Sequence, residues 1–211
     1  MISRRRVPGL LALALCVIGA SAVMASSAFA AGPAFKPGGG KFPVYFTSTS
    51  GPATLATANH NPITCTSDTN VGEITSSTGA GFIIVTFHGC TQKSGTNTLK
   101  CKTTGAAEEE IVTNKLKGTL TGTEAAPTEK LEPESGTEFV KFKCGTVGVI
   151  VTGSVTGTVS PVKTQSHTGT LTFKEATGLT AFEEAAKFTN TDELAFFKNA
   201  AHTESETVEV T

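Results

Sequence analysis

The chain carries few side chains suited to acid–base or nucleophilic chemistry. The histidines and aspartates are His60, His88, His167, His202, Asp68 and Asp192. Hydrolysis by a hydroxyl nucleophile needs a histidine as base and an acid that orients it. Because the sequence has no G-x-S-x-G, S-x-x-K or H-E-x-x-H motif, only the fold could assemble such groups. The sequence therefore assigns no catalytic residue.

Two segments bear a partial likeness to metal sites. Asp68-Thr69-Asn70-Val71-Gly72-Glu73 alternates oxygen ligands before a glycine but lacks the second half of a calcium loop with its bidentate acid. We interpret it as an Asx turn between strands. His88 precedes Cys90 by two residues, yet no CxxC pair or HxxxH companion accompanies them. The sequence predicts no metal site and no cofactor.

The first thirty residues have the pattern of a secretory signal peptide. Three arginines at positions 4–6 precede the apolar run 10–24, which is followed by Ala28-Phe29-Ala30. The small residues at Ala28 and Ala30 place cleavage before Ala31. We therefore expect a secreted or cell-surface-associated protein that has no membrane segment once residues 1–30 are removed. The arginines admit either general secretory or twin-arginine export.

Four cysteines follow the predicted cleavage site: Cys65, Cys90, Cys101 and Cys144. An even number in an exported chain indicates two disulfides. Three pairings are possible. Cys90 and Cys101 flank a turn-rich stretch, so we favour a local bridge between them, which leaves Cys65 to pair with Cys144.

Two regions follow cleavage. Residues 31–43 contain Gly32-Pro33, Lys36-Pro37 and three consecutive glycines, a composition typical of a flexible leader. Residues 44–211 form a single predicted domain.

The composition and patterning of this domain favour strands. The chain after Ala30 contains 36 threonines, which suit a pleated, partly solvated surface. One parity is shared by Val147, Val149, Val151, Val155 and Val159. Cys144 shares a parity with the apolar residues Val140 and Phe142 just upstream, which predicts that its side chain points into the core. We predict an all-β fold, a mostly antiparallel β-sandwich or distorted barrel, with one short helix near 181–190, where Glu183-Glu184-Ala185-Ala186-Lys187 favours helix.

The charge of the predicted mature chain argues against a nucleic-acid partner. All three arginines precede the cleavage site, which leaves 14 lysines against 18 acidic residues, and 14 minus 18 is −4. Phosphate recognition needs clustered lysine and arginine. Scattered lysines also supply no basic patch for attraction to a membrane surface.

Some segments resemble a known group of proteins. Phe87-His88-Gly89-Cys90, Leu116-Lys117-Gly118-Thr119-Leu120 and Phe139 through Pro161 resemble the exported, four-cysteine, Thr/Gly-rich β-proteins of Gram-positive soil bacteria. The resemblance covers most of residues 63–174. It implies a secreted all-β domain, and the group has no assigned activity that would bring site residues with it.

The sequence supports two hypotheses of function. The first is a noncatalytic binding or surface-associated module whose ligand is unknown, with a cell-wall or extracellular polymer as its expected partner. The second is a secreted hydrolase with a dispersed site that contains one of the four histidines. A histidine that meets a hydroxyl and an acid in the fold would favour the second.

Overall fold

The computed structural model describes residues 32–211, in which the regular elements are all strands. Residues 1–31, with the predicted signal peptide, lie outside the described residues. The strands are β1 (Phe35–Pro37), β2 (Val44–Ser50), β3 (Ala53–Ala56), β4 (Ile63–Cys65), β5 (Ser67–Ile74), β6 (Gly79–His88), β7 (Thr91–Ser94), β8 (Asn97–Lys102), β9 (Ile111–Val112), β10 (Leu116–Thr123), β11 (Ala126–Pro133), β12 (Glu138–Cys144), β13 (Val147–Gly153), β14 (Val155–Ser160), β15 (Thr168–Ala181), β16 (Glu184–Phe197) and β17 (Val208–Val210). In this part of the chain no helix is long and apolar enough to cross a bilayer.

The strands close into an elongated, distorted barrel. A first ring runs β10–β11–β14–β15–β16–β2–β5–β6 and closes where β6 pairs with β10. A second ring runs β15–β13–β12–β8–β7–β4–β3–β16 and closes through the pairing of β15 with β16. Both rings are antiparallel throughout, which confirms the predicted all-β class.

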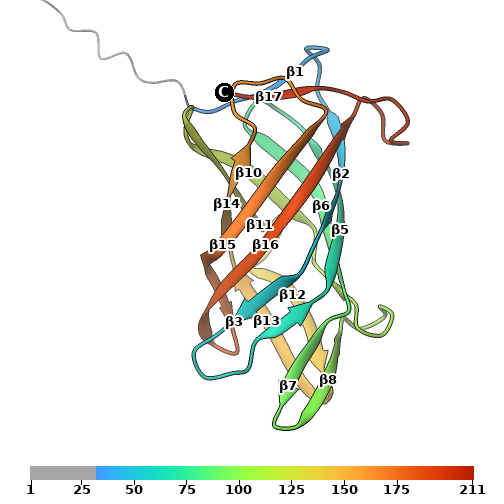
Figure 1. Cartoon of the computed structure of the whole chain (residues 1–211), viewed down its shortest axis with the longest axis vertical. Helices are drawn as coiled ribbons and strands as arrows, with labels where there is room; N and C mark the ends of the chain where they lie inside the picture. The colour runs from blue at the N-terminus through green and yellow to red at the C-terminus, as the bar shows by residue number, and fades with distance from the viewer. Residues whose placement is uncertain (1–31) are drawn as a thin grey trace, which may run out of the picture.

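One hairpin belongs to both rings. β15 and β16 each have 14 residues, and Figure 1 shows them running diagonally along the length of the molecule. Their outer ends pair with β14 and β2 in the first ring, and their ends near the connecting turn pair with β13 and β3 in the second. The two rings are therefore two levels of one barrel.

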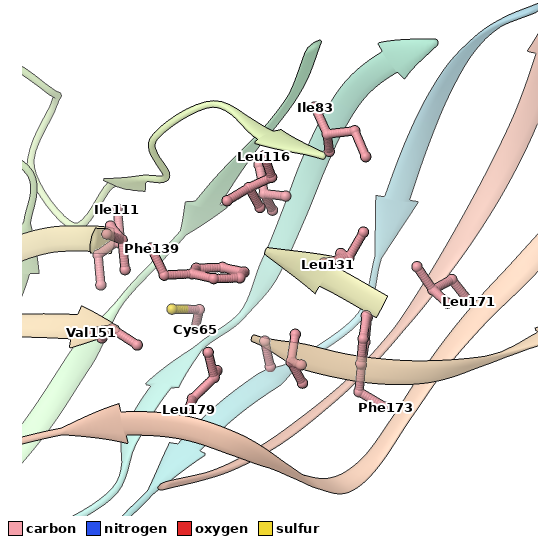
Figure 2. Close-up of a cluster of buried hydrophobic side chains, with 14 of the residues drawn as sticks. Cys65, Ile83, Ile111, Leu116, Leu131, Phe139, Val151, Leu171, Phe173 and Leu179 are labelled. Carbon is pink, nitrogen blue, oxygen red and sulfur yellow. The ribbon is translucent and has the colours of Figure 1, made fainter. Parts of the chain in front are cut away.

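Alternating side chains fill the interior. Val149, Val151 and Val155 are each 1% exposed, as their shared parity predicts, whereas Ile150 points outward. Val147 is exposed and does not follow the predicted pattern. Figure 2 shows buried side chains that converge on the interior from different strands, Leu131 and Phe173 among them. This convergence makes the barrel a packed core along most of its length.

The region predicted to be a flexible leader is partly a strand, so that prediction is wrong for residues 35–37. β1 pairs with β17 in a separate two-stranded sheet, in which Phe35 opposes Val210. Phe35 is buried, and burial of its ring outweighs the disordering effect of the nearby glycines and prolines. This small sheet lies at the end of the barrel drawn at the top of Figure 1.

All four cysteines form disulfides, as predicted, but the pairing that the sequence favoured is wrong. The bridges join Cys65 to Cys90 and Cys101 to Cys144. The four residues lie on the successive sheet neighbours β4, β7, β8 and β12, or immediately before them. The backbones of Cys90 and Cys101 are joined by a hydrogen bond of 2.9 Å. Their side chains nevertheless bond elsewhere, Cys90 to Cys65 and Cys101 to Cys144. Cys144 is fully buried, as predicted.

The helix expected near 181–190 is absent, and a hairpin takes its place. Phe182 and Glu183 both have positive φ, 52° and 62°, which is the geometry of a two-residue type I′ turn. Ala181 and Ala186 on either side are buried. Pairing of β15 with β16 and burial of these alanines override the helical propensity of the segment.

Candidate functional site

A cluster of polar side chains lies inside the first ring. Its members are Ser48 on β2, Asp68 and Asn70 on β5, and Asn190 and Asp192 on β16, all buried. We call these five residues the acid–amide cluster. They meet because β5 and β16 both pair with β2 and because residues two apart on a strand point to the same face. Interpreting residues 68–73 as an Asx turn is therefore wrong, since they belong to β5.

Hydrogen bonds tie the two aspartates to their neighbours. Asn190 Nδ2 donates to Asp68 Oδ2 over 2.8 Å and to Asp192 Oδ1 over 3.3 Å. Asn70 Nδ2 donates to Asp192 Oδ1 over 3.2 Å, and Ser48 Oγ donates to the same oxygen over 3.4 Å. Ser50 Oγ donates to Asp68 Oδ2 over 2.6 Å. The amide nitrogens thus face the carboxylates.

Three oxygens of the cluster have no donor. Asp68 Oδ1, Asn70 Oδ1 and Asn190 Oδ1 are buried and accept no hydrogen bond. The residues that carry them are 1%, 8% and 3% exposed. A buried acceptor without a partner costs about 1–3 kcal/mol, and three in one place are unusual for a folded protein. The cluster therefore has unused capacity to bind a donor or a cation.

Burial and the proximity of Asp68 raise the pKa of Asp192. Burial, followed by the negative charge of Asp68 and hydrogen bonding to it, raises the pKa of Asp192 to about 8. None of the ion pairs formed within residues 32–211 includes Asp68 or Asp192. At neutral pH Asp192 therefore holds a proton.

A further buried acid lines the same interior. Glu129 on β11 is 7% exposed, and desolvation by burial raises its pKa to about 7. Gly118, on the neighbouring strand β10, makes room for it, since a Cβ there would collide with Glu129 Oε1. The missing side chain of Gly118 thus leaves the space that the Glu129 carboxyl occupies.

Three residues of the cluster and Glu129 border a cavity in the first ring. Its volume is about 60 Å³, which is room for about four waters. Asn70, Asn190 and Asp192 line it together with apolar side chains such as Leu171 and Phe173. Phe35, Val208 and Val210 of the β1–β17 sheet also line it. The lining of the cavity is therefore mostly apolar, and Asn70, Asn190, Asp192 and Glu129 are among its polar residues.

The histidines are dispersed, and one of them meets a hydroxyl and an acid. His88 Nε2 lies 3.2 Å from Thr69 Oγ1, and its Nδ1 lies 3.2 Å from Glu110 Oε1. The side chains of His88 and Glu110 are 34% and 31% exposed, on the outside of the barrel. Thr69 is outward-facing because it lies between the inward Asp68 and Asn70.

The other three histidines have different surroundings. His60 stacks on Phe182 with ring centroids 4.1 Å apart and lies 3.6 Å from Glu184. His167 Nδ1 lies 2.9 Å from the backbone oxygen of Glu206, and His202 packs at a tilt against Phe197. All three of these histidines lie in segments that connect strands.

The cluster was not predicted from the sequence, although a signal for it exists. Asp68-Thr69-Asn70 and Asn190-Thr191-Asp192 are the same triplet in opposite order. In a domain predicted to be all strands, each triplet places an acid and an amide on one face. The sequence separation of 122 between Asn70 and Asp192 conceals the pairing, which only the order of strands in the sheet reveals.

Comparison with known protein families, with proteins of curated function and with solved structures gives no match for this chain. Within residues 32–211 no group of three or more histidine, cysteine or acidic side chains is arranged to hold a metal ion. The acid–amide cluster has two acids, and its remaining polar atoms come from asparagine and serine.

Proposed function

We propose that this protein is an exported, noncatalytic binding protein that holds a small ligand inside the first ring of its barrel. The observation that supports this most strongly is the set of three buried acceptor oxygens without donors, two of them on residues that line a cavity of the barrel. Eight-stranded barrels have interiors that side chains fill or that hold one small ligand. Here most of the interior is filled; one free space of about 60 Å³ borders the polar cluster, and another of similar size is lined almost entirely by apolar side chains.

The cavity limits the chemistry of the ligand. Of the acceptor oxygens without donors, those of Asn70 and Asn190 belong to residues that line this cavity, so a ligand that donates hydrogen bonds or carries positive charge suits its polar end. Its other walls are apolar. Because the free space is about 60 Å³, the ligand is small.

Export is part of this proposal. Two disulfides favour an oxidising compartment, and the predicted signal peptide would take the chain there. A cell-wall or extracellular polymer, the partner expected from the sequence, is too large for the cavity and would have to bind the outer face.

The interior site can be tested by thermal unfolding with small probes. Butylammonium and butanol each combine a donor group with a short apolar chain, and either should raise the melting temperature of the wild-type protein. Asn70→Leu removes one acceptor and should abolish the shift. Val71→Thr is the matched control, because Val71 is the next residue on β5 and is 46% exposed. Equal shifts in wild type and Asn70→Leu would contradict the proposed site.

A second candidate function, hydrolysis, is favoured by the contacts of His88. Its ring lies between the Thr69 hydroxyl and the Glu110 carboxylate, in the order of a nucleophile, base and acid. In such a reaction Thr69 Oγ1 would bond to an ester carbonyl carbon while its proton passes to His88 Nε2. The imidazolium, held by Glu110, would return that proton to the departing alcohol, and water would then release the acid.

The hydrolytic candidate predicts activity toward simple esters. Hydrolysis of p-nitrophenyl acetate should fall by at least about a hundredfold in His88→Gln and in Thr69→Val. His202→Gln is the control, since His202 lies against Phe197 in a turn. Identical rates in all four proteins would rule this candidate out and leave the binding function.

A further inference from the structure

The acid–amide cluster combines two carboxyl groups with three donorless oxygens, and the hydrogen bonds within it come from neutral amides and hydroxyls. We propose that this cluster is a binding site for one Ca²⁺ ion. The inference rests on the proposed interior site and names the class of its ligand.

The polar atoms already have the spacing of a calcium shell. Oxygens that share a Ca²⁺ ion at about 2.3–2.6 Å lie roughly 3 Å from one another. Asn190 Nδ2 lies 2.8 Å from Asp68 Oδ2 and 3.3 Å from Asp192 Oδ1, and Asn70 Nδ2 lies 3.2 Å from Asp192 Oδ1. Because Asn70 Oδ1 and Asn190 Oδ1 accept no hydrogen bond where they lie, rotating each amide by half a turn brings its oxygen to the carboxylates without breaking a hydrogen bond to that oxygen. Each amide oxygen would then lie next to a carboxylate oxygen, as neighbouring ligands of one ion do.

The identity of the donors favours calcium among the common metals. Every candidate ligand is an oxygen, whereas zinc prefers sulfur and imidazole nitrogen. Asp68 and Asp192 together match the charge of a divalent ion. Mg²⁺ demands a strict octahedron with short bonds, while Ca²⁺ accepts six to eight oxygens in an irregular arrangement. The cavity beside the cluster has room for the waters that would complete the shell.

Within residues 32–211 no cationic side chain compensates the burial of Asp68 and Asp192. Both aspartates are at most 5% exposed, and no lysine pairs with either among the ion pairs of residues 32–211. Two such carboxyl groups repel each other when ionised and cost free energy unless a cation joins them. An ion between them would bind β2, β5 and β16 together where the first ring contains its polar side chains.

The experiment measures calcium binding directly. The purified protein is treated with EDTA, dialysed and titrated with CaCl₂ by isothermal titration calorimetry, with thermal unfolding in parallel. Wild type should bind one Ca²⁺ per chain and melt at a higher temperature. Asp192→Asn keeps the shape of the side chain and should weaken binding by at least about tenfold. Thr191→Val is the matched control on the outer face of β16 and should bind as wild type does.

Each result decides between outcomes. Equal affinity in Asp192→Asn and wild type would overturn the assignment by locating the ion elsewhere. No binding by wild type at about 10 mM Ca²⁺, beyond the range of extracellular calcium modules, would overturn it without any variant. If butylammonium or butanol still stabilises wild type and not Asn70→Leu in that case, the interior binding function stands with another ligand. If neither probe nor calcium acts, both proposals fail.

Discussion

Glu129 shows how one residue can make the stability of the barrel depend on pH. The carboxyl is buried and forms none of the ion pairs found in residues 32–211. Gly118 beside it leaves the space that the carboxyl occupies. A protonated carboxyl at this position is tolerated, whereas an ionised one must lose its hydration.

We predict that the free energy of unfolding falls as pH rises through neutrality, in part because of Glu129. Burial raises its pKa from 4.5 in the unfolded chain to about 7 in the folded one. Between these values the folded state holds one more proton, so stability is highest at low pH and is lost as pH passes 7. The loss is about 3 kcal/mol. Urea unfolding of wild type and Glu129→Gln between about pH 5 and pH 8 measures it, because glutamine removes this component.

The control for this prediction is Glu132→Gln. Glu132 lies on the same strand but is paired with Lys130 and Lys117 outside the barrel, and the hydrogen bond from Lys130 lowers its pKa. The control should therefore keep the steep decline of wild type. Parallel pH profiles for wild type and Glu129→Gln would show that Glu129 is not the group responsible.

Among the elements, the β15–β16 hairpin depends on a turn that its residues fit poorly. Phe182 and Glu183 both adopt positive φ, which is unfavourable for side chains with a Cβ. Phe182 gains a compensating contact by stacking on His60. Glu183 is exposed and retains only the conformational cost.

Glu183→Gly should therefore stabilise the protein. Glycine adopts a φ of 62° without a steric penalty, and the expected gain is about 1 kcal/mol, or about 2–4 °C in melting temperature. Lys187→Gly, at an exposed position of β16, should lower the melting temperature, since glycine weakens a strand interior. A lower melting temperature in Glu183→Gly would contradict the type I′ assignment. Differential scanning calorimetry resolves these differences.

The same hairpin shows what a sequence reveals about individual elements. Strands with clear alternation, such as that around Val149 and Val151, were predicted because each inward residue is apolar. The segment around Glu184 was predicted as a helix because local propensity favours one, and strand pairing overrides propensity. β1 escaped prediction because its one buried residue, Phe35, lies among glycines and prolines.

For the whole molecule, the decisive information is which strands become neighbours. The fold class follows from composition and alternation, but neither encodes the order β4–β7–β8–β12 that pairs the cysteines. Proximity in sequence favours a bridge between Cys90 and Cys101. The sheet, however, also places Cys90 beside Cys65 and Cys101 beside Cys144, and these pairs form the bridges. Asp68 and Asp192 were likewise noticed as rare residues, and only the closure of the first ring brings them together.

We predict that each disulfide contributes about 2–4 kcal/mol to stability. Cys65→Ala/Cys90→Ala and Cys101→Ala/Cys144→Ala remove bridges with sequence separations of 25 and 43 residues, and loss of the longer loop should cost slightly more. Each double variant should contain no free thiol by Ellman titration. Free thiols in both would contradict the pairing, and unchanged unfolding in urea would contradict the energetic role.

The place of β15 and β16 in the chain has a consequence for how the protein is made. Both rings use this hairpin as a wall, and its partners β2 and β3 come from the beginning of the domain. The second ring cannot close before residues 187–189 of β16 have been synthesised, and the first not before residues 192–197. Incomplete chains therefore carry an open sheet with unpaired edges, which favours aggregation. The barrel must complete its folding late, and a chaperone that shields β2 and β3 until then would suit this order of assembly.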